Sequence, residues 1–182
     1  SQSAPLPRDA QSMVYDTTTT RVVAFGGKGT HDRYLNDLWA YHLTARTWTR
    51  LTPAGILPAP RFGQGMAYDS AADKIAIFGG VSIAGTTPQL SADTWAYSSR
   101  TSRWTHDQAG EHPAARLYPS MAYDPVTRTI FLFGGGARTD AFNDTWSYDT
   151  RTGRWTRVAA LGTPPARWGA SMIYDPAADK II

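Results

Sequence analysis

Cysteine is missing from the 182 residues of this chain, and glutamate occurs only once, at Glu111. Without cysteine the chain has no disulfide framework, no thiolate metal site and no cysteine nucleophile, and nothing indicates its redox compartment. A single glutamate also gives little support to the paired carboxylates of glycosidase chemistry. These shortages remove several common catalytic sites from consideration.

Long apolar runs and long runs of like charge are missing as well. No stretch of 18 apolar residues is available for a membrane helix, and no basic-then-apolar leader opens the chain. Arginine supplies 15 of the 18 basic residues and aspartate 14 of the 15 acidic ones, and the two types are interspersed. A net charge of +3 spread in this way does not form the basic patch that nucleic-acid binding requires. We therefore predict no membrane span and no nucleic-acid partner.

What the sequence does contain is a repeat. The triplet Phe-Gly-Gly occurs at residues 25–27, 78–80 and 133–135, at intervals of 53 and 55 residues. Each copy follows a short β-branched run and precedes a segment of variable length that ends in Asp-x-Trp. A period of this size indicates an array of one structural unit.

Each unit reads as four short strands, A to D, joined by polar turns. In the first unit these are residues 11–15, 21–25, 37–41 and 47–50. The Trp and Tyr of strand C are two residues apart and so share one face, and a second Trp follows nine residues after the first. Four such strands cannot bury both faces alone, which predicts that the units stack, most simply around an axis.

The double glycine that ends strand B, with the strand C Tyr and the strand D Trp at these offsets, resembles the kelch repeat. Asn-Asp-x-Trp-x-Tyr at 36–41 and 143–148 is similar to the kelch arrays of bacterial secreted or surface proteins. The resemblance implies an all-β fold, a β-propeller of four-stranded antiparallel blades. It implies one propeller segment over 1–182, with blades at about 8–52, 61–106 and 116–158 and a half blade at about 167–182. It favours an extracellular, cell-surface or periplasmic location, with the cytoplasm as the alternative.

Three and a half blades do not close a ring, because closed propellers have about four to eight. We expect the chain to be a fragment of a longer propeller, or to take its remaining blades from another copy. Two copies placed head to tail have the wrong strand order, since each begins and ends with strands A and B.

Several repeated positions are predicted to be structural. The paired glycines suit a crowded inner strand end that needs positive φ or close backbone approach, and the tryptophans suit the space between blades. These positions are Gly26, Gly27, Gly79, Gly80, Gly134, Gly135, Trp39, Trp48, Trp95, Trp104, Trp146 and Trp155. An arginine also precedes every strand A, at Arg8, Arg61, Arg116 and Arg167, and is predicted to hydrogen-bond carbonyls or the strand C Asp.

The resemblance also implies where partners bind. In kelch adaptors, the B–C loops and the D–A connections open on one face and contact the partner. The corresponding candidates are Asp9, Lys28, His31, Arg33, Tyr34, Phe62, Leu117, Arg138, Asp140, Phe142 and Trp168. Residue types differ from unit to unit at these positions, and exposed Arg, Tyr, Trp and Phe are typical interface anchors. The alternative is that they are ordinary loop residues; Trp168 is the strongest single candidate.

The polar group His106, Asp107, Glu111 and His112 is the only dense set of weak metal-ligand candidates. Its spacing matches no helix-borne metal motif, so we predict neither a metal nor another cofactor. The sequence favours a non-catalytic interaction scaffold that binds a protein or glycan partner through the B–C and D–A loops. The alternative is part of a secreted carbohydrate-active or oxidative enzyme whose active residues lie in blades outside this chain.

Overall fold

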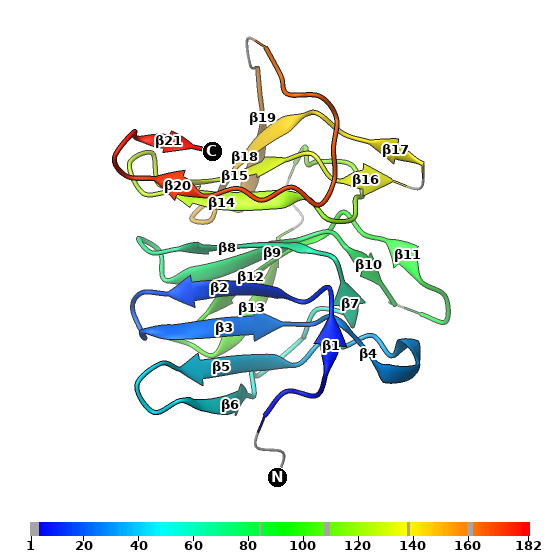
Figure 1. Ribbon diagram of the computed structural model, residues 1–182, viewed down its shortest axis with the longest axis vertical. Coiled ribbons are helices and arrows are strands. Elements are labelled where there is room, and N and C mark those ends of the chain that lie inside the picture. The colour runs from blue at the N-terminus through cyan, green and yellow to red at the C-terminus, as the bar shows by residue number, and fades with distance from the viewer. Residues whose placement is uncertain (1–3, 84, 108–109, 138, 160–161) are drawn as a thin grey trace.

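The computed structural model describes residues 4–83, 85–107, 110–137, 139–159 and 162–182. Within these ranges the fold is all-β apart from one 3₁₀ turn, Thr30–Asp32. Three four-stranded antiparallel sheets follow one another in sequence order, and a two-stranded pair lies beside the third (Figure 1). We call these sheets blades 1 to 3 and the half blade. None of the helical segments in the described ranges is long and apolar enough to cross a membrane.

Each blade is a meander in which every strand pairs with the next. Blade 1 consists of β2 (Ser12–Asp16), β3 (Arg21–Phe25), β5 (Leu38–His42) and β6 (Thr47–Leu51). Blade 2 consists of β8 (Gly65–Asp69), β9 (Lys74–Phe78), β12 (Thr94–Ser98) and β13 (Arg103–Asp107). Blade 3 consists of β14 (Ser120–Asp124), β15 (Thr129–Phe133), β18 (Thr145–Asp149) and β19 (Arg154–Val158). The half blade consists of β20 (Tyr174–Asp175) and β21 (Lys180–Ile181).

The segments that the sequence presents as irregular loops contain further short strands. They are β1 (Arg8–Asp9), β4 (Lys28–Gly29), β7 (Arg61–Phe62), β10 (Val81–Ser82), β11 (Gln89–Leu90), β16 (Gly136–Ala137) and β17 (Asp140–Ala141). β1 pairs with β4, β10 lies between β11 and β7, and β16 pairs with β17. All of them lie at one end of the blades, opposite the A–B and C–D turns (Figure 1). We call this end the loop face.

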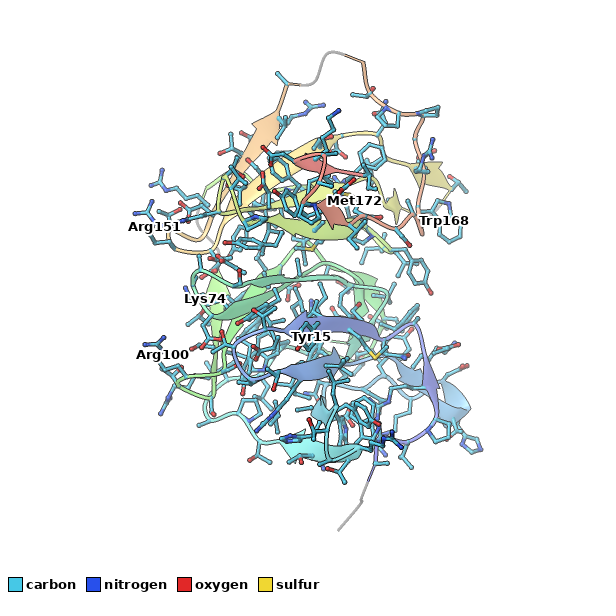
Figure 2. All side chains as sticks on the ribbon, turned by 60° about the vertical axis from the view of Figure 1, so that its left-hand side comes forward. Tyr15, Lys74, Arg100, Arg151, Trp168 and Met172 are labelled. Carbon is cyan, nitrogen blue, oxygen red and sulfur yellow. The ribbon has the colours of Figure 1, made fainter. Side chains whose placement is uncertain are left out.

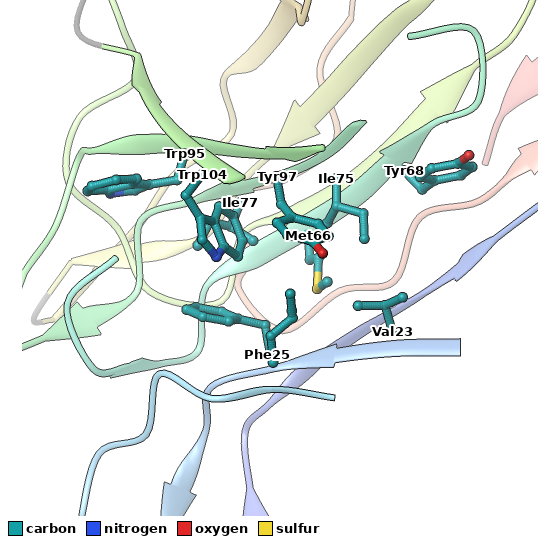
Figure 3. Close-up of a cluster of buried hydrophobic side chains, with 10 residues drawn as sticks. Val23, Phe25, Met66, Tyr68, Ile75, Ile77, Trp95, Tyr97 and Trp104 are labelled. Atoms are coloured by element: carbon teal, nitrogen blue, oxygen red, sulfur yellow. The ribbon is translucent and has the colours of Figure 1, made fainter. Parts of the chain in front are cut away.

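The hydrophobic core lies between blades rather than within them. One cluster packs Val23, Phe25 and Leu38 of blade 1 against the aromatic and aliphatic side chains of blade 2 (Figure 3). The Trp104 ring lies 5.1 Å from the Phe25 ring, and the Trp155 ring lies 5.1 Å from the Phe78 ring in the next interface. The strand D tryptophan of one blade therefore packs on the Phe-Gly-Gly phenylalanine of the blade before it.

Trp48 differs from the other five repeated tryptophans. Those five are 1 to 7% exposed, whereas Trp48 is only half-buried. Its ring contacts Tyr41 of the same blade, with centroids 5.0 Å apart. The described chain offers it no phenylalanine from a preceding blade. Phe133 of blade 3 is also half-buried, and no strand D tryptophan among the described residues packs on its ring.

Gly79 shows why the inner strand ends require glycine. Its φ is +71°, and a Cβ atom built on it would lie 2.6 Å from the Arg116 carbonyl oxygen of the next unit. We expect Gly79→Ala to lower the free energy of unfolding by about 1 to 3 kcal/mol, through strain and the displaced backbone. Gly169→Ala is the control, because Gly169 has a φ of +69° but no atom within 4 Å of the added Cβ. Equal losses in urea titrations of the two variants would show that the close approach is unimportant.

Candidate interaction surface on the loop face

Buried arginine side chains form ion pairs with strand C aspartates beneath the loop face. The Arg61 guanidinium donates to Asp93 Oδ1 and Oδ2 at 2.5 and 2.7 Å and to the Gly79 carbonyl at 3.0 Å. Arg116 donates in the same way to the two carboxylate oxygens of Asp144 at 2.6 and 2.9 Å and to the Gly134 carbonyl at 2.8 Å. Arg8 donates to Asp37 and to the Gly26 carbonyl. The strand C indole N–H donates to the same aspartate in each blade. The predicted structural role of these arginines is confirmed for Arg8, Arg61 and Arg116.

Asp93 carries the strongest pKa shift among these carboxylates. Burial alone would raise its pKa, but hydrogen bonds and charge from Arg61, with hydrogen bonds from Ser91 and Trp95, lower the pKa from 3.8 to about 2. The pKa values of Asp37 and Asp144 are lowered by the same balance of burial and arginine contacts.

This shift makes stability pH-dependent in acid. Because the folded pKa of Asp93 lies below its unfolded value, its contribution is complete above about pH 4 and is lost as pH falls through about 2. We expect a loss of about 2 kcal/mol from this group alone, measured as the free energy of unfolding in urea at pH 5 and pH 2. Asp93→Asn should be less stable at pH 5 but should show a flatter profile below pH 4. An unchanged slope in that variant would assign the acid sensitivity to other groups.

A ladder of backbone hydrogen bonds crosses the loop face from blade to blade. It uses the second residue after each arginine: Ala10, Gly63, Tyr118 and Gly169. All four have left-handed φ values, between 51° and 69°. The N–H of Gly63 donates to the Ala10 carbonyl at 2.9 Å, that of Tyr118 to Gly63 at 2.7 Å and that of Gly169 to Tyr118 at 3.1 Å. The ladder therefore joins all three blades and the half blade.

Four aromatic side chains, Tyr34, Phe62, Tyr118 and Trp168, form a continuous row beside this ladder. Successive ring centroids are 4.9, 6.5 and 5.9 Å apart, and the last two rings are nearly parallel, at 19°. Trp168 is 61% exposed and the other three are half-buried. In Figure 2, Trp168 lies on the opposite side of the molecule from Arg100 and Arg151. We call these four residues the aromatic row.

The structure brings some of the predicted partner-binding residues together and separates others. Tyr34, Phe62 and Trp168 belong to the aromatic row. Lys28 Nζ lies 5.9 Å from the Phe62 ring centroid and forms an ion pair with Asp32 at 2.8 Å. The candidates Asp9, His31, Arg33 and Asp140 are exposed, and they lie in or next to the short elements of the loop face. Arg138 lies outside the described residues.

Two further candidates have structural contacts. The Phe142 ring packs against the buried Arg116 guanidinium, whose Cζ lies 4.1 Å from the ring centroid. The Leu117 backbone N–H and carbonyl both bond with Gly136, each at 2.8 Å. Phe142 therefore covers the arginine that holds blade 3 together, and Leu117 joins its D–A connection to the B–C hairpin.

Tyr118 belongs to the surface although sequence reasoning did not select it. The sequence drew attention to the residue directly after each arginine, which is Leu117 in this unit. Its neighbour Tyr118 stands where the other units have the small residues Ala10, Gly63 and Gly169. A bulky residue among small ones at one repeat position is the signal that would have identified it.

The weak metal-ligand candidates have other contacts in the structure. The His106 ring stacks on Trp95, with centroids 4.3 Å apart and planes at 7°. Asp107 accepts a hydrogen bond from the Tyr148 hydroxyl, and burial together with Asp107 raises the pKa of that tyrosine. His112 contacts the Pro113 carbonyl at 3.0 Å, and Glu111 is exposed. Within the described part of the chain, no three His, Asp or Glu side chains gather in a group that could hold a metal ion.

Three features define a kelch-type propeller segment: the four-stranded blades, the tryptophans between blades and the repeated Arg–Asp ion pair. The chain belongs to the kelch-repeat family: the family model described as the KLHDC2/KLHL20/DRC7 Kelch-repeats domain matches residues 1–181.

Relatives among known proteins share the repeat over part of their length. Multiple epidermal growth factor-like domains protein 8 of Homo sapiens is 29% identical over 168 residues, covering 86% of this chain and 6% of that protein. Host cell factor homolog hcf-1 of Caenorhabditis elegans is 25% identical over 163 residues, covering 80% and 21%. Acyl-CoA-binding domain-containing protein 6 of rice is 30% identical over 154 residues, covering 81% and 23%. The chain thus spans less than a quarter of each, and these eukaryotic relatives lend no support to the bacterial type predicted from the strand C motif.

Proposed function

We propose that this kelch segment is a non-catalytic interaction module that binds a protein or glycan partner through its loop face. The observation that supports this most directly is the aromatic row, whose rings reach the surface where the B–C hairpins and D–A connections meet. Aromatic side chains with exposed faces are typical anchors of interfaces.

A second contrast within the chain points in the same direction. The arginine before strand A and the aspartates of strand C and of the A–B turn recur in every blade and are bonded internally, as in the Arg61–Asp93 pair and in the turn where Asp16 accepts the Thr18 and Thr19 N–H groups. The polar residues that differ between blades, such as His31, Arg33 and Asp140, are exposed. The scaffold therefore leaves the variable residues free for contact with a partner.

The test is cross-linked affinity capture from the native source with the full-length protein, followed by mass spectrometry. We expect partners to be lost when Arg33→Ala and Trp168→Ala are combined on the loop face. They should be retained in the control that combines Arg100→Ala and Val126→Ala at the opposite turns, where both side chains are exposed. Equal recovery with both double variants would contradict the proposal. Turnover of sugars or alcohols by the full-length protein would favour the enzyme alternative instead.

A further inference from the structure

Tyr118 has a backbone conformation that its side chain disfavours. Its φ is +51°, in the left-handed region where a bulky residue is a genuine outlier. The hydrogen-bond ladder needs only this backbone conformation, which Gly63 and Gly169 supply at the same position without a side chain. Unfavourable conformations of this kind cluster at functional sites. The ladder therefore does not explain why this position is a tyrosine.

The Tyr118 side chain makes the aromatic row continuous. Its ring stands between Phe62 and Trp168, with centroids 6.5 and 5.9 Å away, and it also lies over Gly63, where a Cβ atom would come 2.9 Å from Tyr118 Cε1. With glycine at position 118, the row would be interrupted at its centre. The tyrosine thus connects the aromatic residues of blades 1 and 2 with Trp168 at the start of the half blade.

The row offers apolar ring faces and hydrogen-bond donors. Within the described residues, the Tyr34 and Tyr118 hydroxyls and the Trp168 indole N–H have no hydrogen-bond partner. The backbone beneath them is already paired, since the N–H and carbonyl groups of both Gly63 and Tyr118 belong to the ladder. An added β-strand would therefore find no unpaired N–H or carbonyl group at Gly63 or Tyr118. The complementary ligand is extended, apolar and rich in acceptors.

We infer that the aromatic row binds an extended proline-rich segment of a partner protein, an inference that rests on the proposed interaction function. Proline presents a flat apolar ring and a carbonyl acceptor but no N–H donor. A polyproline II segment rises about 3.1 Å per residue, so ring steps of 4.9 to 6.5 Å correspond to about two residues each. Aromatic-lined surfaces are a general mode of binding such segments.

The experiment is fluorescence anisotropy with a labelled twelve-residue peptide of alternating proline and leucine, added to the full-length protein. We expect saturable binding that unlabelled peptide competes away and that a glycine-serine peptide of the same length does not. Tyr118→Gly and Trp168→Ala should each weaken binding by at least about tenfold. The exposed control Val126→Ala, at the opposite turns, should leave it unchanged. Tyr118→Gly should also keep the wild-type melting temperature within a few degrees, because it restores the residue that Gly63 and Gly169 show to fit this backbone.

Three results would overturn the inference: no saturation up to about 1 mM peptide, equal affinity for the glycine-serine peptide, or unchanged affinity in both row variants. A cello-oligosaccharide run in parallel separates this outcome from a failure of the proposed function. If the sugar binds and the proline peptide does not, the loop face remains an interaction surface while its ligand class is different. If the capture experiment also shows no dependence on the loop face, the proposed function fails as well.

Discussion

Arg116→Ala is expected to lower the free energy of unfolding by about 3 to 5 kcal/mol, because it leaves a largely buried carboxylate without its partner. The Arg116 side chain is fully buried and Asp144 is 15% exposed. The substitution removes both hydrogen bonds to Asp144, the bond to the Gly134 carbonyl and the packing on Phe142. Blade 3 then loses the group that ties its D–A connection to strands β15 and β18.

The chain contains a matched control for this substitution. Arg167 occupies the same repeat position but is exposed, and the only hydrogen bond of its side chain within the described residues runs from Nε to the Pro165 carbonyl at 3.1 Å. We expect Arg167→Ala to change the free energy of unfolding by no more than about 0.5 kcal/mol. Chemical denaturation at pH 7 measures both variants. Similar losses would mean that the aspartate contact is not the source of the Arg116 effect. Adding Asp144→Ala to Arg116→Ala should recover part of the loss.

Trp155→Ala should cost about 3 to 5 kcal/mol as well, through a cavity between two blades. Trp155 is 7% exposed, and its ring packs 5.1 Å from Phe78 and 4.8 Å from Tyr148. Its indole N–H also donates to the Thr94 hydroxyl at 2.8 Å, a buried contact that joins blade 3 to blade 2. For a chain of this size we expect the melting temperature to fall by about 2 to 4 °C for each kcal/mol, measured by calorimetry.

Trp48→Ala is the control for Trp155→Ala. Trp48 holds the same position in blade 1, but Tyr41 of its own blade is its only aromatic neighbour among the described residues. We expect less than half the loss seen for Trp155. If the two variants were equally destabilised, the stabilisation would come from packing within a blade, and the assignment of the core to the blade interfaces would be wrong.

Much of the blade could be predicted from the sequence because it depends on local patterns. Trp95 and Tyr97 face the same interface because side chains two apart on a strand share a face. Asp16 and Asp69 open A–B turns because an aspartate side chain accepts N–H groups two and three residues ahead. The pairing of Arg61 with Asp93 could be expected because each unit repeats both residues at nearly the same distance.

The candidate site was less accessible to the same reasoning. Phe142 and Trp168 were both predicted to contact a partner, with Trp168 as the strongest candidate, but the sequence did not show that Phe142 packs on Arg116 while Trp168 reaches the surface. Tyr118 was missed because its importance depends on a left-handed backbone and on rings from two other units. Phe142 meets an arginine 26 positions earlier in the chain, and Tyr118 meets rings 56 and 50 positions away.

The sequence by itself determined the repeat, the four strands of each unit and the residues that join them, since strand alternation, turn chemistry and the Arg–Asp pair recur in every unit. Only the tertiary structure decided which aromatic residues meet on the loop face. Blade stacking lines up one residue from each D–A connection through the hydrogen-bond ladder, and the resulting row contains Phe62, Tyr118 and Trp168 side by side. A pattern within one unit carries no information about this alignment, because the contacts form between units.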